Sequence, residues 1–204
     1  MSGLTTDLRK MSAARSTDKR TNKDILSVSA TPNGVMAEHI PPSSGRCRVG
    51  IGNDLHRLAE GRKLIVGGVH IPFGKGPVGH SDGDVLAHAV CDALLGAAHL
   101  GDIGRHFPNT APQWKNASST LFLRYVRQLL EAAGYSIINI DATVGLERPK
   151  LAPHVTSMEK KVAAALALKP GQVSVKAKSG EGLDAVGRGE AIRADAVALI
   201  QTGS

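Results

Sequence analysis

Helical periodicity marks three stretches of the chain. Between residues 82 and 100, apolar side chains recur every three or four positions, which is the spacing of a helix with one buried face. Residues 118–134 repeat this pattern and end in Gly134, a residue type that often terminates helices. Residues 153–168 give the third stretch. The pattern therefore predicts three helices after residue 80.

Other stretches alternate between apolar and polar positions or are rich in β-branched residues, as strands are. They cover residues 47–51, 63–66, 69–71, 136–147, 173–178 and 191–200. Gly67 and Gly68 stand between the second and third of these, and paired glycines favour the tight turn of a hairpin. The order of strands and helices predicts an α+β fold, a two-layer domain in which a mixed β-sheet carries helices on one face.

The first part of the chain lacks such patterns. Residues 1–46 are rich in Ser, Thr, Asn, Lys and Arg and end in the run Pro41-Pro42-Ser43-Ser44-Gly45. No apolar stretch of the kind found in secretory signals occurs there, and acidic residues argue against a transit peptide. We therefore expect a disordered N-terminal extension over residues 1–46 and one folded domain over residues 47–204.

Composition narrows the classes of function. The hydrophobic content is 42% and no stretch has the roughly 20 apolar residues of a membrane helix, so we expect no membrane partner. The net charge of +7 is spread along the chain, and it suits anionic small molecules at least as well as nucleic acid, which we do not expect as a partner. Cys47 and Cys91 lack C-x-x-C spacing, and Cys91 has the setting of a buried reduced thiol. We expect a bacterial cytoplasmic location, with a plastid as the alternative.

A candidate metal site lies in the first half of the folded part. Asp54 and His56 are two apart on an expected strand, so their side chains point to the same side. His88 lies on the following helix, whose first turn Ser81 or Asp82 can cap. Three mixed nitrogen and oxygen ligands with one open position are typical of a catalytic zinc site. The alternative for His88 is a histidine that is hydrogen-bonded in the core.

Further polar segments suit a phosphate-bearing ligand. His80 and Ser81 precede a helix N-terminus, where free N–H groups favour an anion. The run Lys176–Glu181 combines two cations, a hydroxyl and a carboxylate, and such a carboxylate beside phosphates suits Mg²⁺. Residues 101–108 contain two glycines around Asp102, although a plain loop is the alternative there. Together these segments indicate a zinc site beside a diphosphate pocket with room for a second divalent ion.

These residues resemble the 2-C-methyl-D-erythritol 2,4-cyclodiphosphate synthase family of the non-mevalonate isoprenoid pathway. The resemblance covers residues 47–203, and its motifs are specific in their order and spacing. They are Asp54-x-His56, His80-Ser81-Asp82-Gly83-Asp84 with His88, Gly101-Asp102-Ile103-Gly104, Pro149-Lys150, Lys176-Ala177 and Gly187-Arg188-Gly189-Glu190.

The resemblance implies a homotrimer with active sites between subunits. It implies a lyase that converts 4-diphosphocytidyl-2-C-methyl-D-erythritol 2-phosphate to the 2,4-cyclodiphosphate plus CMP. One Zn²⁺ per subunit would be bound by Asp54, His56 and His88. His80 and Ser179 would be catalytic, and Glu181 would hold a Mg²⁺ or Mn²⁺ that bridges the substrate phosphates.

The resemblance also implies a set of substrate-binding residues. They are Asp54, His56, His80, Ser81, Asp102, Ile103, Gly104, Phe107, Ala111, Leu146, Lys150, Lys178, Ser179, Glu181, Ala185 and Arg188. Three departures from the family pattern stand out: Ala111 replaces a frequent acidic residue, residues 178–180 replace threonines, and Ala185 replaces a bulkier aromatic. Because none touches the expected metal ligands, we expect activity to survive. The alternatives are a zinc phosphohydrolase and a trimeric binding protein without turnover.

Overall fold

The computed structural model describes residues 46–202, so the predicted extension over residues 1–46 lies almost wholly outside the described residues. Five strands form the main sheet in the order β4-β1-β7-β5-β6. They are β1 (Cys47–Glu60), β4 (Lys75–Pro77), β5 (Tyr135–Gly145), β6 (Val173–Lys178) and β7 (Ala191–Thr202). Only β5 and β6 run parallel, and the other neighbours are antiparallel. The mixed sheet of the predicted α+β fold is confirmed.

A separate hairpin joins β2 (Leu64–Val66) to β3 (Val69–Ile71), as predicted. Gly67 and Gly68 turn the chain there with φ of 57° and 72°, angles that side chains with a Cβ rarely adopt. The short strand β4 pairs with the end of β1 and had no clear pattern in the sequence.

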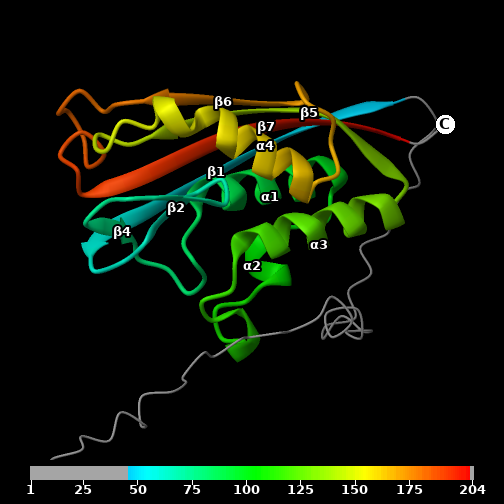
Figure 1. Ribbon diagram of the computed structural model, residues 1–204. Coiled ribbons are helices and arrows are strands. Elements are labelled where there is room, and N and C mark those ends of the chain that lie inside the picture. The colour runs from blue at the N-terminus through cyan, green and yellow to red at the C-terminus, as the bar shows by residue number, and fades with distance from the viewer. Residues whose placement is uncertain (1–45, 203–204) are drawn as a thin grey trace, which may run out of the picture. The chain divides into compact units, whose positions relative to one another are not determined.

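Helices lie along one side of the main sheet (Figure 1). The three predicted helices are α1 (Val85–Ala98), α3 (Ser119–Ala132) and α4 (Val155–Ala165). Three short elements were not predicted: α2 (Ile103–His106) and the 3₁₀ turns η1 (Pro112–Trp114) and η2 (Ala152–His154). Among residues 46–202, no helix combines the length and the apolar content that crossing a bilayer requires.

The N-cap of α1 differs from the expected one. Asp84 is the N-cap, because its carboxylate accepts a hydrogen bond from the backbone N–H of Ala87 at 3.1 Å. The same carboxylate accepts the N–H groups of Gly67 and Gly68 at 2.8 and 2.6 Å. Ser81 and Asp82, which were predicted as caps, make other contacts before the helix begins. Asp84 therefore ties the hairpin to the start of α1.

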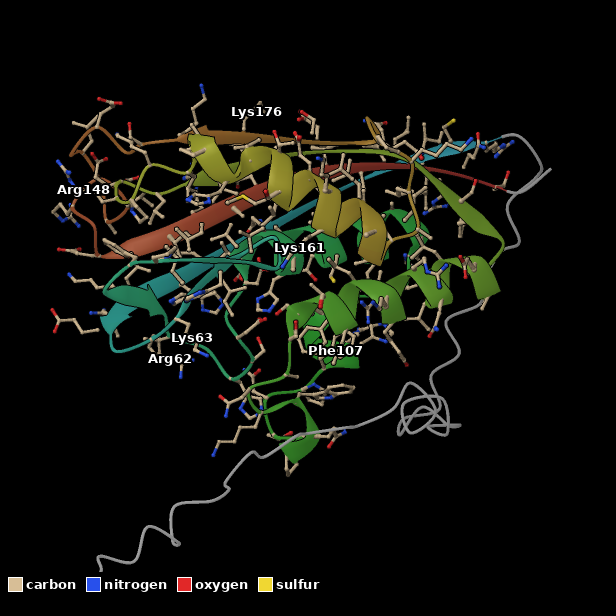
Figure 2. The ribbon with its side chains drawn as sticks, in the orientation of Figure 1. Arg62, Lys63, Phe107, Arg148, Lys161 and Lys176 are labelled. Atoms are coloured by element: carbon tan, nitrogen blue, oxygen red, sulfur yellow. The ribbon has the colours of Figure 1, made fainter. Side chains whose placement is uncertain are left out.

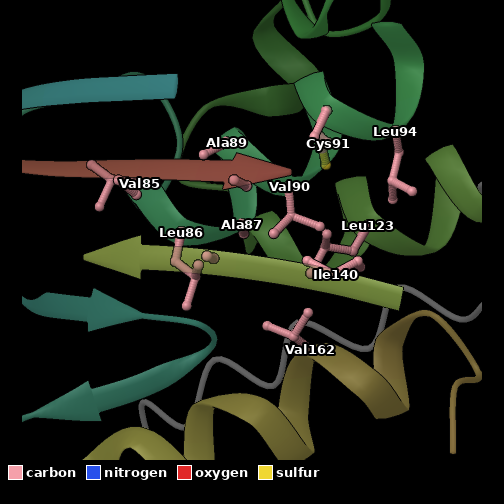
Figure 3. Close-up of a cluster of buried hydrophobic side chains, with 14 of the residues drawn as sticks. Val85, Leu86, Ala87, Ala89, Val90, Cys91, Leu94, Leu123, Ile140 and Val162 are labelled. Carbon is pink, nitrogen blue, oxygen red and sulfur yellow. The ribbon is translucent and has the colours of Figure 1, made fainter. Parts of the chain in front are cut away.

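The core is built around α1, which packs against β1, β7 and α3, and part of it is drawn in Figure 3. Its buried side chains are small and aliphatic, and they pack against residues such as Leu123, Ile140 and Val162 from other elements. Cys91 is among them as a free buried thiol, as predicted. An aromatic cluster of Phe107, Trp114, Phe122 and Tyr125 lies beside α3. Within it, Phe107 stacks on Phe122 with ring centroids 4.1 Å apart.

Strand β1 approaches α1 unusually closely because two glycines face the helix. A Cβ on Gly50 would stand 2.1 Å from the Ala93 carbonyl oxygen, and one on Gly52 would stand 2.1 Å from that of Ala89. Side chains at these positions are sterically impossible without moving the helix. The two glycines therefore set the spacing between β1 and the helix that carries His88.

Candidate metal centre and active site

Asp54, His56 and His88 converge at the junction of β1 and α1. Their candidate ligand atoms all lie within 4.8 Å of one another. Asp54 Oδ2 is 3.0 Å from His56 Nε2 and 2.8 Å from His88 Nδ1. All three side chains are partly buried. The structure thus brings together the three residues that the sequence predicted as metal ligands.

Strand geometry explains this convergence. Along β1, Gly50, Gly52, Asp54 and His56 face α1, because successive side chains alternate between the two sides of a sheet. Two glycines admit the helix, and the next two inward positions carry polar ligands. His88 lies one turn into α1, where it meets them. An Asp-x-His pair on a strand and a histidine on the next helix therefore form one site.

His56 is oriented by a backbone carbonyl. Its Nδ1 lies 2.8 Å from the oxygen of Val78, a contact that only a protonated Nδ1 can make. Arg62 donates to the carbonyls on either side, those of Pro77 and Gly79, at 3.2 and 3.1 Å. The loop that holds the ring is therefore itself held in place.

This orientation of His56 leaves its other ring nitrogen, Nε2, without a hydrogen-bond donor among the described residues. With the proton on Nδ1, His56 Nε2 carries a lone pair and points towards a carboxylate, and within residues 46–202 this buried atom has no hydrogen-bond partner. Its 3.0 Å distance to Asp54 Oδ2 brings two acceptors together without the geometry of a hydrogen bond. A proton or a metal ion between them would satisfy both atoms, and with His88 completing the set these residues fit a divalent metal ion.

Electrostatics keep the aspartate ionised. Burial alone would raise the pKa of Asp54, but the neighbouring His56 and His88 outweigh it and hold the pKa of this carboxyl well below its usual range. In return, the interaction with Asp54 raises the pKa of His56 against the opposing effect of burial. An ionised carboxylate beside two imidazoles is a donor set that suits zinc.

The residues before α1 lie beside the triad. Ser81 is buried, and its Oγ is 3.1 Å from His88 Nε2. Ser119, the first residue of α3, places its Oγ 2.8 Å from the same nitrogen. His80 Nε2 is 3.3 Å from the carbonyl oxygen of Ala111. Sequence reasoning missed Ser119, because nothing local distinguishes it from other serines near helix starts.

The segment after α1 is anchored to the same helix. Asp92 lies one turn beyond His88, and its carboxylate accepts the N–H of Ile103 at 2.7 Å. This contact holds Asp102, Ile103 and Gly104 near the end of α1. Burial raises the pKa of Asp92, and the hydrogen bond opposes the shift. The spacing of four residues from His88 is a helical signal that could have identified Asp92.

Phe107, one of the predicted substrate-binding residues, lies in the interior. Its ring is 5% exposed and belongs to the aromatic cluster beside α3 (Figure 2). Phe122 of that cluster also stacks near His88, with ring centroids 6.1 Å apart. The ring of Phe122 therefore packs against the face of the His88 ring.

A second polar group gathers where β5 and β6 end side by side. Gly180 donates its N–H to the carboxylate of Glu147 at 3.1 Å, and the N–H of Leu146 donates to the backbone carbonyl oxygen of Lys178 at 2.9 Å. The hydroxyl of Ser179 donates to Glu181. The remaining predicted residues of this region lie in the same loops: Lys150, Ala185 and Arg188. Arg188 forms an exposed ion pair with Glu190.

The two groups lie at the same end of the sheet but on different strands. His56 is level with Ile192 of β7, and Gly145 of β5 is level with Arg193. Since β7 separates β1 from β5, the two strands are about 10 Å apart. Within residues 46–202, no hydrogen bond or ion pair joins the second group to the triad.

Comparison with known proteins places the chain. The YgbB family profile matches residues 47–201. The 2-C-methyl-D-erythritol 2,4-cyclodiphosphate synthase of Chloroherpeton thalassium is 56% identical over 76% of this chain and 98% of its own length. The synthase of the same name from Nitrosospira multiformis is 53% identical over 76% of this chain and 88% of its own.

A solved structure agrees with the sequence relatives. A 2-C-methyl-D-erythritol 2,4-cyclodiphosphate synthase in its CDP-bound form superposes with a TM-score of 0.70 and 40% identity. The match covers 76% of this chain and all of that one. These similarities confirm the resemblance seen in the motifs: the chain belongs to the YgbB family, whose relatives are named 2-C-methyl-D-erythritol 2,4-cyclodiphosphate synthase.

Proposed function

We propose that this chain is a metal-dependent 2-C-methyl-D-erythritol 2,4-cyclodiphosphate synthase. It would convert 4-diphosphocytidyl-2-C-methyl-D-erythritol 2-phosphate to the 2,4-cyclodiphosphate and release CMP. The observation that carries this proposal is the triad of Asp54, His56 and His88, with a buried Nε2 on His56 that lacks a partner within residues 46–202. Relatives at 53–56% identity with this name support it.

The reaction is an internal phosphoryl transfer. An oxygen of the 2-phosphate forms a bond to the β-phosphorus, and the bond from that phosphorus to the bridging oxygen of CMP breaks. Because both reacting groups belong to one molecule, the protein must mainly hold them in line and offset their negative charge. A bound Zn²⁺ would supply Lewis-acid stabilisation of a phosphate oxygen at the open position of the triad.

The other residues have roles that their positions support. His80 and Ser81 lie between β4 and α1, beside the triad, and His80 would donate a hydrogen bond to a phosphate oxygen. Ser179 would donate its hydroxyl to the phosphates, and Glu181, which already accepts that hydroxyl, would bind a Mg²⁺ or Mn²⁺. Leu146 would border the cytidine and Lys150 would lie near the phosphates, in line with the CDP in the similar solved structure.

An assembly of three copies would complete the site. The face of β1 that points away from α1 exposes Val49, Ile51 and Leu55 by 67, 73 and 60%, and Val197 of β7 stands opposite Ile51. Exposed apolar patches of this kind mark protein interfaces. In a homotrimer packed on this face, the second polar group of one copy would face the triad of its neighbour. A cytoplasmic location fits the reduced thiol of Cys91.

Turnover by the purified full chain tests the proposal. The diphosphocytidyl substrate is incubated with Zn²⁺ and Mg²⁺ and followed by phosphorus NMR. We expect a cyclic diphosphate together with CMP in equal amounts, and neither product with His88→Ala. Inorganic phosphate or an open-chain phosphate would instead identify a phosphohydrolase. An unchanged spectrum with a zinc-loaded protein would identify a binding protein.

A further inference from the structure

His88 begins a chain of partly buried hydrogen bonds on the side facing away from Asp54. Its Nε2 lies 2.8 Å from Ser119 Oγ, and Ser119 is fully buried. The hydroxyl of Ser119 donates to Asp82 Oδ1, and its backbone N–H donates to Asp82 Oδ2 at 3.0 Å. Asp82 thus holds both the side chain and the backbone of Ser119, 37 positions away in the sequence.

The direction of these hydrogen bonds determines the protonation of the imidazole. A carboxylate can only accept, so the single hydroxyl proton of Ser119 points to Asp82. The Ser119 oxygen then has only lone pairs to offer His88, and Nε2 must carry the ring proton. Ser81 is compatible with this state, because its Oγ lies 3.1 Å from Nε2 and can accept from it while also accepting the N–H of Gly83 at 3.3 Å.

A neutral ring with its proton on Nε2 presents a lone pair on Nδ1. That atom lies 2.8 Å from Asp54 Oδ2, the same oxygen that lies 3.0 Å from His56 Nε2. In His56 the proton is on Nδ1, which donates to the carbonyl oxygen of Val78, so the lone pair is on Nε2 instead. His56 therefore presents Nε2, and His88 presents Nδ1, to the same oxygen of Asp54. In each ring the protonation of the other nitrogen is set by its hydrogen-bond partner, Val78 for His56 and Ser119 for His88.

We propose that Ser119, oriented by Asp82, is a positioning residue of the metal centre: it fixes His88 in the tautomer with Nε2 protonated and so directs Nδ1 to the metal. The inference deepens the proposed function, because it rests on the triad binding zinc. Partners behind metal-bound histidines set ring orientation and tautomer in this way. Here the partner is the first residue of α3, so the start of that helix is part of the centre.

Zinc affinity of Ser119→Ala in the full chain tests the proposal. A chromophoric chelator competes for zinc with the wild type and the variant. We expect the zinc dissociation constant to rise about 10- to 100-fold, the usual effect of removing such a partner. Ser118→Ala is the matched control: its hydroxyl is exposed and contacts Thr120 rather than His88, so its affinity should equal that of the wild type.

Nitrogen NMR of the imidazole rings in the zinc-free proteins measures the tautomer of His88 directly. A general loss of packing would not by itself change this tautomer. We expect the His88 signals of the wild type to show the proton on Nε2, and those of Ser119→Ala to show a mixture of tautomers. If the alanine variant does not fold, Ser119→Thr retains the hydroxyl and should keep the wild-type tautomer, and Asp82→Asn should disturb it.

The outcomes separate the two proposals. A wild type that does not bind zinc sinks the metal centre, while the tautomer measurement still decides the role of Ser119. A wild type that binds zinc, together with an alanine variant of equal affinity and unchanged tautomer, overturns the positioning role alone. Equal losses in Ser118→Ala and Ser119→Ala would also overturn it, since the effect would belong to the helix start in general.

Discussion

The two sides of β1 have opposite characters, although they alternate residue by residue along one strand. The side facing α1 carries Gly50 and Gly52, followed by Asp54 and His56. The other side carries large apolar residues that are 60 to 73% exposed in the single chain. A strand normally buries its apolar side and exposes its polar side, and here the polar ligands face the interior.

This reversal has a physical consequence on each side. On the inner side, missing side chains let the helix approach until the ligand atoms of His88 and Asp54 lie 2.8 Å apart. On the outer side, Ile51 and its apolar neighbours are exposed. They would contribute hydrophobic stabilisation only if another surface covered them. The inner side is thus complete within one chain, whereas the outer side is the face that we propose as the interface of a homotrimer.

The largest effect is expected from the inner polar positions. His56→Ala should abolish zinc binding and lower turnover about 10³-fold or more, since metal stabilisation of the transition state is worth several kcal/mol. Metal analysis and phosphorus NMR measure both. His70→Ala removes an exposed histidine from the hairpin and should match the wild type. Equal zinc content in the His56 variant would contradict the assigned ligand set.

The inner glycines should be the next most sensitive. Gly52→Ala places a Cβ 2.1 Å from a carbonyl oxygen of α1, so the helix must shift, and we expect a loss of about 3 kcal/mol or more in unfolding free energy. Gly74→Ala adds the same atom where nothing lies within 4 Å and should change little. Denaturant titration compares the two. Equal stabilities would show that the close approach of strand and helix is dispensable.

The outer side should respond in assembly rather than in folding. Ile51→Lys should convert trimers to single chains in sedimentation velocity, because a buried lysine at this position would lack a partner. The unfolding free energy of the isolated chain should stay within about 0.5 kcal/mol, as for other exposed positions. Phe73→Lys, in the loop after β3, serves as the control. A variant that sediments like the wild type would rule out this face as the interface.

The smallest effect concerns the pH dependence of stability. Burial, reinforced by the charge of Asp82, raises the pKa of Asp84 to about 6 despite three backbone donors. A raised carboxyl pKa means that the folded state binds a proton more tightly, so this contribution is present below about pH 4 and is lost as pH rises to about 6. Asp84→Asn should remove this slope from plots of unfolding free energy against pH. A slope that persists in the variant would assign it to other groups.

The sequence was sufficient to predict those features that depend on a short repeating pattern of neighbouring residues. The alternation of β1 placed Asp54 and His56 on one side, and the periodicity of α1 placed His88 in its first turns, so the triad could be predicted. Gly67 and Gly68 indicated the hairpin for the same reason, because a tight turn depends on its own two residues. Family motifs covered residues of the second polar group, whose roles remain predictions.

Prediction failed where a side chain had several partners to choose from. Ser81 and Asp82 had the residue types of an N-cap, yet the cap is Asp84, which also binds the hairpin glycines. Ser119 carried no signal at all, because its importance comes from His88 and Asp82, both far away in the chain. The strand β4 was too short to show a period.

The sequence by itself determined the three long helices, most of the strands, the candidate ligand triad and the family of this protein, because periodicity and motif spacing are local properties of the chain. The tertiary structure decided which nitrogen of each histidine faces the site, which aspartate caps α1 and which side of β1 is left uncovered. Those features depend on hydrogen-bond directions and close approaches between segments distant in sequence, and only the folded chain brings such segments together.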